Sequence, residues 1–363
     1  MNTTTNRSRI AVCAMLAAFA LTTVRPAFAQ MAPAQSPAAA KEEPIKLAEF
    51  TINETLDNPY LSKQALSGTR VAMAIQDIPQ TVSIVTSEFI QDSMSQRMLD
   101  AAKYVTPVVE STLPIGGDRY TIRGFQVSHE FIDGMVISGE DGYSMAEAPY
   151  NIDRIEIIKG PNAILVPGGA PGGQFNPITK SPIMKDQQTA TLELAQYFGT
   201  ALSTDINRVI SSQKGIAVRF VAAVWDSKGY QKNSFRKGYE FAPSISWQLS
   251  PTTKLVVKGE FVQNREIPGF GAPLDPSVGS DGYAIIAKGL PKDWSFSGGE
   301  AYDHRHRRTD RVTIELLSTL IDKINSRLSV SAAHILRADQ GGPSAALLAP
   351  DPPTGALVAF NTT

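Results

Sequence analysis

The second half of the sequence alternates between apolar and polar side chains with a period of two. The clearest segment carries its apolar side chains at five odd-numbered positions: Tyr239, Phe241, Ile245, Trp247 and Leu249. The same alternation recurs near residues 253–263 and 309–321. Because successive side chains of a β-strand point to opposite faces, each segment predicts a strand with one apolar and one polar face.

Soluble β-sandwiches and transmembrane β-barrels both show this alternation, and the connections between segments separate the two classes. Seven strands are predicted, near residues 189–198, 202–211, 215–226, 239–249, 253–263, 309–321 and 326–337. Short turns at 212–214, 250–252 and 322–325 alternate with long connections at 227–238 and 264–308, and only the one at 199–201 is unexpectedly short. Short turns on one side and long loops on the other are typical of outer-membrane barrels.

The first 29 residues have the three parts of a secretory signal peptide. Arg7 and Arg9 supply a basic start, an apolar run follows, and Ala-Phe-Ala at 27–29 is a small-x-small cleavage site. The single cysteine, Cys13, lies inside this signal, so the predicted mature chain has no thiol for disulfides, catalysis or metal binding. A formal net charge of −1 gives no electrostatic footprint for nucleic acid.

Residues 67–183 indicate a small domain of mixed helix and strand. A turn and strand over 75–86 lead into a helix that Ser87 is expected to cap, with Glu88 in its first turn. The apolar face of this helix, with a break expected at 92–95, is formed by Ile90, Met94, Met98, Leu99, Ala102 and Val105.

Glycines mark the turns of this domain, around a short alternating strand with Ile155 and Ile157. The structural turn residues are Gly124, Gly134, Gly160, Pro161, Gly172 and Gly173. Glycine at this density indicates backbone that turns sharply or passes close to other backbone. Pro177 lies in the strand that follows. Because proline cannot donate to a ladder, this strand is expected at a sheet edge or beside a bulge.

The order of these elements resembles the plug of TonB-dependent outer-membrane receptors, siderophore-receptor branch. The shared elements are Ile-Pro-Gln at 78–80, Ile-Arg-Gly-Phe at 122–125, Asp-Gly at 133–134 and Lys-Gly-Pro at 159–161. The resemblance implies an α+β plug domain at 67–183, followed at 187–363 by antiparallel transmembrane β-barrel strands, about seven of roughly 22. Because the last residues lack the terminal aromatic strand of such barrels, a C-terminally incomplete receptor is expected.

The resemblance also assigns a role to the segment between the signal and the plug. Residues 30–66 are rich in Ala, Pro and Gln and are expected to form a flexible linker. Within this linker, the strand-capable residues 43–52 would be the TonB box, which pairs as an added strand with the energy-transducing protein TonB. Its apolar residues are Ile45, Leu47, Phe50 and Ile52.

Two further sets of plug residues follow from the resemblance. Arg123 and Lys159 match the basic plug positions that meet glutamates on the barrel wall and would act as a plug–barrel latch. Contacts to the transported ligand are expected from outward-facing plug loops. The alternative is that the side chains of these loops have no role in binding. The expected ligand-binding residues are Gln126, His129, Glu130 and Tyr143.

The implied function is TonB-dependent import of ferric siderophores across the outer membrane. The alternatives are another bulky nutrient, such as a glycan or cobalamin, and a truncated gene product that does not transport. An enzyme is disfavoured, because the sequence has no nucleophile elbow, zincin helix or paired-acid motif. No catalytic residue, metal site or cofactor is predicted, since iron would arrive as a chelate. His304 and His306 lie among arginines, which favours recruitment of an acidic chelate over a cation site.

A peptide spanning Glu42 to Asn53 should bind the C-terminal domain of TonB as an added strand. Ile45→Pro removes a main-chain donor, so the variant peptide should bind more weakly. Isothermal titration calorimetry of the two peptides measures the difference, and equal affinities would contradict strand pairing.

Overall fold

The computed structural model describes residues 60 to 360, with gaps at 61, 63, 68–72, 79, 106–107, 111–119, 128–130, 137–145, 147, 161–170, 197–198, 230–233, 268–303, 322–323, 341–346 and 351–356. All described residues belong to the second of two compact units, Thr51–Thr363. The predicted signal peptide and TonB box lie outside the described residues, and so do His129, Glu130, Tyr143 and Pro161.

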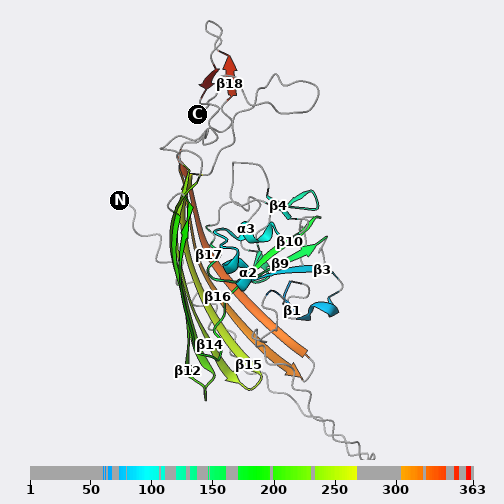
Figure 1. Cartoon of the computed structure of the whole chain (residues 1–363). Coiled ribbons are helices and arrows are strands. Elements are labelled where there is room, and N and C mark those ends of the chain that lie inside the picture. Colours follow the sequence, from blue (N-terminus) through cyan, green and yellow to red (C-terminus); the bar gives the residue numbers. More distant parts are fainter. Residues whose placement is uncertain are drawn as a thin grey trace, which may run out of the picture. The chain divides into compact units, whose positions relative to one another are not determined.

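The largest element is an antiparallel sheet of seven strands, each paired with its neighbours in sequence order (Figure 1). These strands are β11 (Gln187–Ala195), β12 (Gly199–Ser211), β13 (Ile216–Lys228), β14 (Phe235–Ser250), β15 (Thr253–Ile267), β16 (His304–Ile321) and β17 (Ile324–Gln340). Each strand predicted from the alternation has one counterpart. The main difference is β16, which begins five residues before the predicted start at 309.

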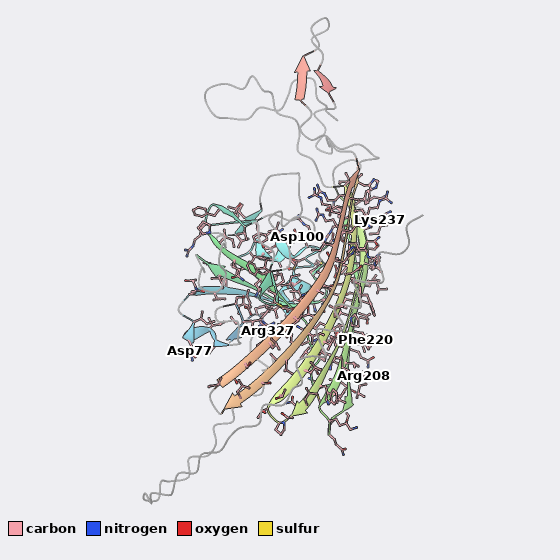
Figure 2. The ribbon with its side chains drawn as sticks, turned by 180° about the vertical axis from the view of Figure 1, so that it is seen from behind. Asp77, Asp100, Arg208, Phe220, Lys237 and Arg327 are labelled. Carbon is pink, nitrogen blue, oxygen red and sulfur yellow. The ribbon has the colours of Figure 1, made fainter. Side chains whose placement is uncertain are left out.

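The two faces of this sheet are inverted relative to a soluble sheet. Its apolar side chains are exposed, with Tyr239 at 41% and Trp247 at 45% of their full accessibility. Phe220, labelled in Figure 2, is another exposed member of this face. Charged side chains of the opposite face are buried, among them Glu240 and Arg311. This distribution fits a sheet whose outer face meets lipid. Within the described segments, the helices are all too short or too polar to cross a membrane.

Pairing between β14 and β15 is interrupted in the middle of the two strands. Phe241 pairs with Phe261, and Ser244 pairs with Lys258. The two residues between them on β14 are not paired with β15. One of these is Pro243, which has no N–H to donate. Gly259 lies across from Pro243, and a Cβ atom on this glycine would be 3.3 Å from the proline ring.

The plug contains a second antiparallel sheet, of three strands in the order β10-β9-β3. Their bounds are β3 (Thr81–Thr86), β9 (Ile152–Lys159) and β10 (Gly173–Thr179). The strand β10, which contains Pro177, lies at the edge of this sheet, and its register shifts between Ile178 and Thr179. Both features predicted from the proline are therefore confirmed.

Two short helices, α2 (Ser87–Asp92) and α3 (Met98–Ala102), complete the plug core. The expected break between them is confirmed, but two details of the prediction were wrong. The cap is Thr86, whose hydroxyl accepts the N–H of Phe89 at 3.3 Å, and not Ser87. Met94 lies in the break with φ of 47° and is 65% exposed, so it does not belong to the buried face.

The buried core of the plug joins these helices to the sheet and includes Val85, Ile90, Leu99, Ile122, Ile155 and Ile157. The remaining short elements are β1 (Gln64–Ala65), β2 (Met73–Ala74), the 3-10 turn η1 (Ile75–Asp77), β4 (Val108–Glu110), β5 (Tyr120–Ile122), β6 (Phe125–Val127), β7 (Phe131–Ile132), β8 (Met135–Val136), β18 (Leu347–Pro350) and β19 (Leu357–Phe360). The strand β1 lies within the residues predicted to be linker.

Two glycines at the start of β10 are places where backbone segments nearly touch. A Cβ atom on Gly172 would lie 2.1 Å from the carbonyl oxygen of Ile122, and one on Gly173 would lie 2.1 Å from that of Ile158. Gly173 also has φ of 146°. The other predicted turn glycines, Gly124, Gly134 and Gly160, have φ of 84°, 76° and 111°.

Gly172→Ala should therefore destabilise the plug by about 4 kcal/mol or more, because the added methyl group meets fixed backbone. Gly124→Ala is the matched control. Nothing lies within 4 Å of its added Cβ, so only the backbone strain of about 1 to 2 kcal/mol remains. Scanning calorimetry of the two variants compares the costs, and equal costs would contradict the close approach.

Candidate functional site

The plug meets the inner face of the seven-stranded sheet around Asp133. This residue occupies the turn between β7 and β8, has φ of 54° and is 1% exposed. Its carboxylate accepts hydrogen bonds from the backbone N–H of Thr179 at 2.8 Å and from the Thr179 hydroxyl at 2.7 Å. Its own N–H donates to the carbonyl oxygen of Pro177 at 2.9 Å. The turn is thus fixed to the end of β10.

We call the seven-stranded sheet the wall. Three of its cationic side chains converge on this turn from neighbouring strands. Lys258 of β15 places Nζ 3.5 Å from Asp133 Oδ1, and Arg311 of β16 places Nη1 3.4 Å from Oδ2. Arg327 of β17, labelled in Figure 2, donates from Nη2 to the Asp133 carbonyl oxygen at 2.8 Å. One plug residue is therefore bonded to three adjacent wall strands.

Wall carboxylates balance these cations. Arg311 donates from Nε to Glu260 at 2.8 Å, and Arg327 donates to Glu315 at 2.6 Å. The resulting network has three acids and three bases: Asp133, Glu260, Glu315, Lys258, Arg311 and Arg327. Buried charges are tolerated when they are paired and hydrogen-bonded, and removal of one partner is costly. This network is the polar core between plug and wall.

Asp133 is ionised at neutral pH. Its burial acts to raise the pKa of the carboxyl group, but the charges of Lys258 and Arg311 and the two bonds from Thr179 outweigh burial and lower the pKa to about 2. Asp133 is therefore an acceptor and a negative charge over the whole physiological range.

A second contact joins the plug to the first strands of the wall. Lys180, just after β10, donates to the carbonyl oxygen of Tyr150 at 2.8 Å and lies 2.9 Å from Asp205 of β12. Arg219 of β13 binds the same carboxylate through two N–H groups, at 2.8 and 2.7 Å, and donates to the Ser181 carbonyl oxygen at 3.0 Å. Asp205 is thus shared by one plug cation and one wall cation.

The predicted latch residues lie elsewhere. Arg123 is exposed on the turn between β5 and β6, with φ of 53°, and its guanidinium lies 3.3 Å from the Cβ position of Gly160. Lys159 is the partly buried last residue of β9. Within the part of the chain that the structure describes, neither residue forms an ion pair, so their latch role stays a prediction. Gln126 lies in β6, opposite Thr121.

Asp133, Lys180 and their wall partners are contact residues that the sequence pattern did not predict. Asp133 was visible only as part of an Asp-Gly turn. A stronger signal was present on the wall, where Lys258 and Arg311 occupy the polar phase of predicted transmembrane strands. A charge near the middle of such a strand must face a polar partner inside the barrel, which a search for mid-strand charges would have detected.

Comparison with known proteins agrees with this architecture. Residues 74–174 match the TonB-dependent Receptor Plug Domain. The metal-pseudopaline receptor CntO of Pseudomonas aeruginosa is 30% identical over 292 residues, which cover 73% of this chain and 41% of that receptor. The ferrichrome outer membrane transporter/phage receptor of Escherichia coli is 24% identical over 240 residues, which cover 64% of this chain and 32% of that protein. The chain thus spans 32% to 41% of the length of these relatives.

Solved structures show the same fold. The pyoverdine outer membrane receptor FpvA from Pseudomonas aeruginosa has a TM-score of 0.68 at 19% identity, over 77% of this chain and 40% of that receptor. The closed form of the ferric-catecholate import receptor Fiu from Escherichia coli has a TM-score of 0.67 at 22% identity, over 79% of this chain and 42% of that receptor.

A plug bound through buried charges to an inverted antiparallel sheet defines a plugged outer-membrane barrel. Residues 74–174 are a TonB-dependent receptor plug domain, and the chain is similar to such receptors over the plug and part of the barrel. The ferrichrome relative is named as an outer membrane transporter, and FpvA is named as an outer membrane receptor. The exposed apolar face of the wall fits that location.

Asp133→Asn should loosen the plug, because the remaining network keeps three buried cations with only two carboxylates. The expected cost is about 3 to 5 kcal/mol, as for other broken buried pairs. Asp100→Asn is the matched control, since its pair with Arg97 is partly exposed and should contribute less than about 1 kcal/mol. Calorimetry of the receptor in detergent measures both, and similar small effects would show that Asp133 does not hold the plug.

Proposed function

We propose that the receptor to which this chain belongs imports a ferric siderophore across the outer membrane. The observation that supports this most directly is the buried ionic contact between plug and wall, centred on Asp133. A plug held by ion pairs and hydrogen bonds can close the barrel and still move, because water can replace such contacts. Attachment through an apolar core would expose hydrocarbon at every opening.

The names of the relatives support a chelate as the cargo. They are named for metal-pseudopaline, ferrichrome, pyoverdine and ferric catecholate. One of these names specifies a metal rather than iron, so chelates of other metals belong among the ligands to be tested. A glycan or cobalamin is the rival cargo on the same fold.

The energy for transport would come from TonB. Residues 43–52 form the proposed TonB box, in which Ile45, Leu47, Phe50 and Ile52 alternate with or flank polar positions. Addition of this segment as a strand to TonB would let the partner pull on the N-terminal side of the plug.

The remaining assignments complete the proposal. Gln126, His129, Glu130 and Tyr143 would contact the chelate through hydrogen bonds and aromatic surface. Arg123 and Lys159 would pair with wall carboxylates beyond those described. A chelate already satisfies its metal, so the receptor needs no metal ligands of its own.

Uptake of radiolabelled ferric siderophores by the host tests this function. Deletion of the gene should abolish uptake of one of the siderophores tested, and reintroduction of the gene should restore that uptake. Deletion of residues 43–52 should leave binding of that ligand intact and abolish its uptake, whereas deletion of residues 31–40, of equal length in the same linker, should leave both. Unchanged metal acquisition together with loss of glycan or cobalamin uptake would refute the siderophore assignment.

A further inference from the structure

Glu156 is a fully buried carboxylate that stands between two isoleucines of the plug sheet. It lies in the middle of β9, the central strand of the plug sheet, and is 0% exposed. Its neighbours Ile155 and Ile157 belong to the plug core, so the alternation of a strand directs Glu156 to the opposite face. A charge at such a place must be matched by donors.

The donors come from the N-terminal end of the described chain. Oε2 of Glu156 accepts the backbone N–H of Ser67 at 2.7 Å and the Ser67 hydroxyl at 2.6 Å. The backbone N–H of Leu66 lies 2.9 Å from both carboxylate oxygens. Arg154 supplies a further N–H to Oε1 at 2.8 Å. We call the segment Ala65–Ser67 the strap, because Glu156 fastens it across the plug sheet.

The strap depends on this carboxylate more than on its own strand pairing. Its residues are buried, with Ala65 at 0% and Ser67 at 5% exposure. The ladder that includes it, between β1 and β2, contains only two residue pairs. Hydrogen bonds to an ionised acceptor are about twice as strong as neutral ones. Glu156 is therefore the main attachment of the strap.

The strap is also connected to the Asp133 turn. The Ser67 hydroxyl accepts a hydrogen bond from Asn176 Nδ2 at 2.6 Å. The Oδ1 atom of the same Asn176 accepts the backbone N–H of Gly134 at 3.0 Å. Gly134 follows Asp133, whose carboxylate and carbonyl oxygen meet the wall cations. A continuous series of buried hydrogen bonds thus runs from the strap to the wall.

From this arrangement we infer that the strap is a releasable fastening whose withdrawal from Glu156 loosens the Asp133 turn from the wall. Withdrawal removes three donors from a buried carboxylate and one partner from Asn176. Leaving buried hydrogen-bonding groups without partners costs free energy. Because Glu156, Asn176 and the Asp133 turn share one network, loss of the strap weakens the hydrogen bonds of all three. The inference rests on the proposed function only for the source of the pull, since the strap follows the proposed TonB box along the chain, after Tyr60 and its hydrogen bond to Asp92.

Thiol labelling of the receptor in outer-membrane vesicles tests the fastening without transport. Leu66→Cys keeps the backbone N–H that binds Glu156 and places a reporter in a buried position; the chain's only other cysteine is Cys13, which is replaced by serine. Added Glu156→Gln should speed labelling about tenfold or more, and the milder Ser67→Ala about threefold. The control Glu88→Gln, in an exposed residue of α2, should leave the rate unchanged.

The connection to the wall is tested by combining variants in the same reporter background. Ser67→Ala with Asp133→Asn should change the labelling rate by a factor clearly different from the product of the single factors, because both residues belong to one network. Ser67→Ala with Asp100→Asn should give the product. A simple product for both combinations, or unchanged rates for Glu156→Gln and Ser67→Ala, would overturn the inference.

A third measurement separates this inference from the proposed function. In cells that contain TonB and a transported chelate, the reporter should label faster than in cells without TonB. If the vesicle results hold but TonB has no effect, the strap stands and TonB as its puller is refuted. If siderophore uptake is demonstrated while Glu156→Gln changes neither labelling nor uptake, the proposed function stands and the strap is refuted.

Discussion

The structure depends on the pairing of buried charges across the boundary between plug and wall. An apolar outer face commits each wall strand to a polar inner face, and the inner face needs a polar partner where water is excluded. Asp133 supplies that partner to Lys258, Arg311 and Arg327 at once. The plug therefore does for the wall what an apolar core does for a soluble sheet, and neither part would bury its charges satisfactorily without the other.

The elements with a local physical cause could be predicted from the sequence. Period-two alternation located all seven wall strands, and the missing N–H of Pro177 located an edge strand with a shifted register. The prediction started β16 too late because Arg305 and Arg307 indicated a basic loop. Both side chains are buried on the polar face of the strand. Side chains of a barrel strand face lipid and the barrel interior in turn, and an arginine is suited to the positions that face the interior.

Contacts between distant segments could not be read from the sequence. Glu156 is a single acid between isoleucines, which signals a buried charge, but its partners in the strap lie 89 and 90 residues earlier. Asp133 similarly meets residues more than a hundred positions later, on strands whose order had to be known first. At the start of α2, Thr86 and Ser87 offer the same hydroxyl chemistry, and only the backbone geometry at Thr86 decides between them. The ligand-binding residues and the latch of Arg123 and Lys159 remain predictions.

The interrupted pairing opposite Pro243 lies beside the contact between wall and plug. Sheets resist bending through their ladders, and here the ladder between β14 and β15 passes over two residues. Lys258 and Glu260 flank Gly259 on the opposing strand, and these are the two residues through which β15 takes part in the plug network. The ladder between β15 and β16 continues without a break through Lys258, Gly259 and Glu260. The backbone of Glu260 is therefore held in place by β16 alone, at the point where β14 leaves the ladder.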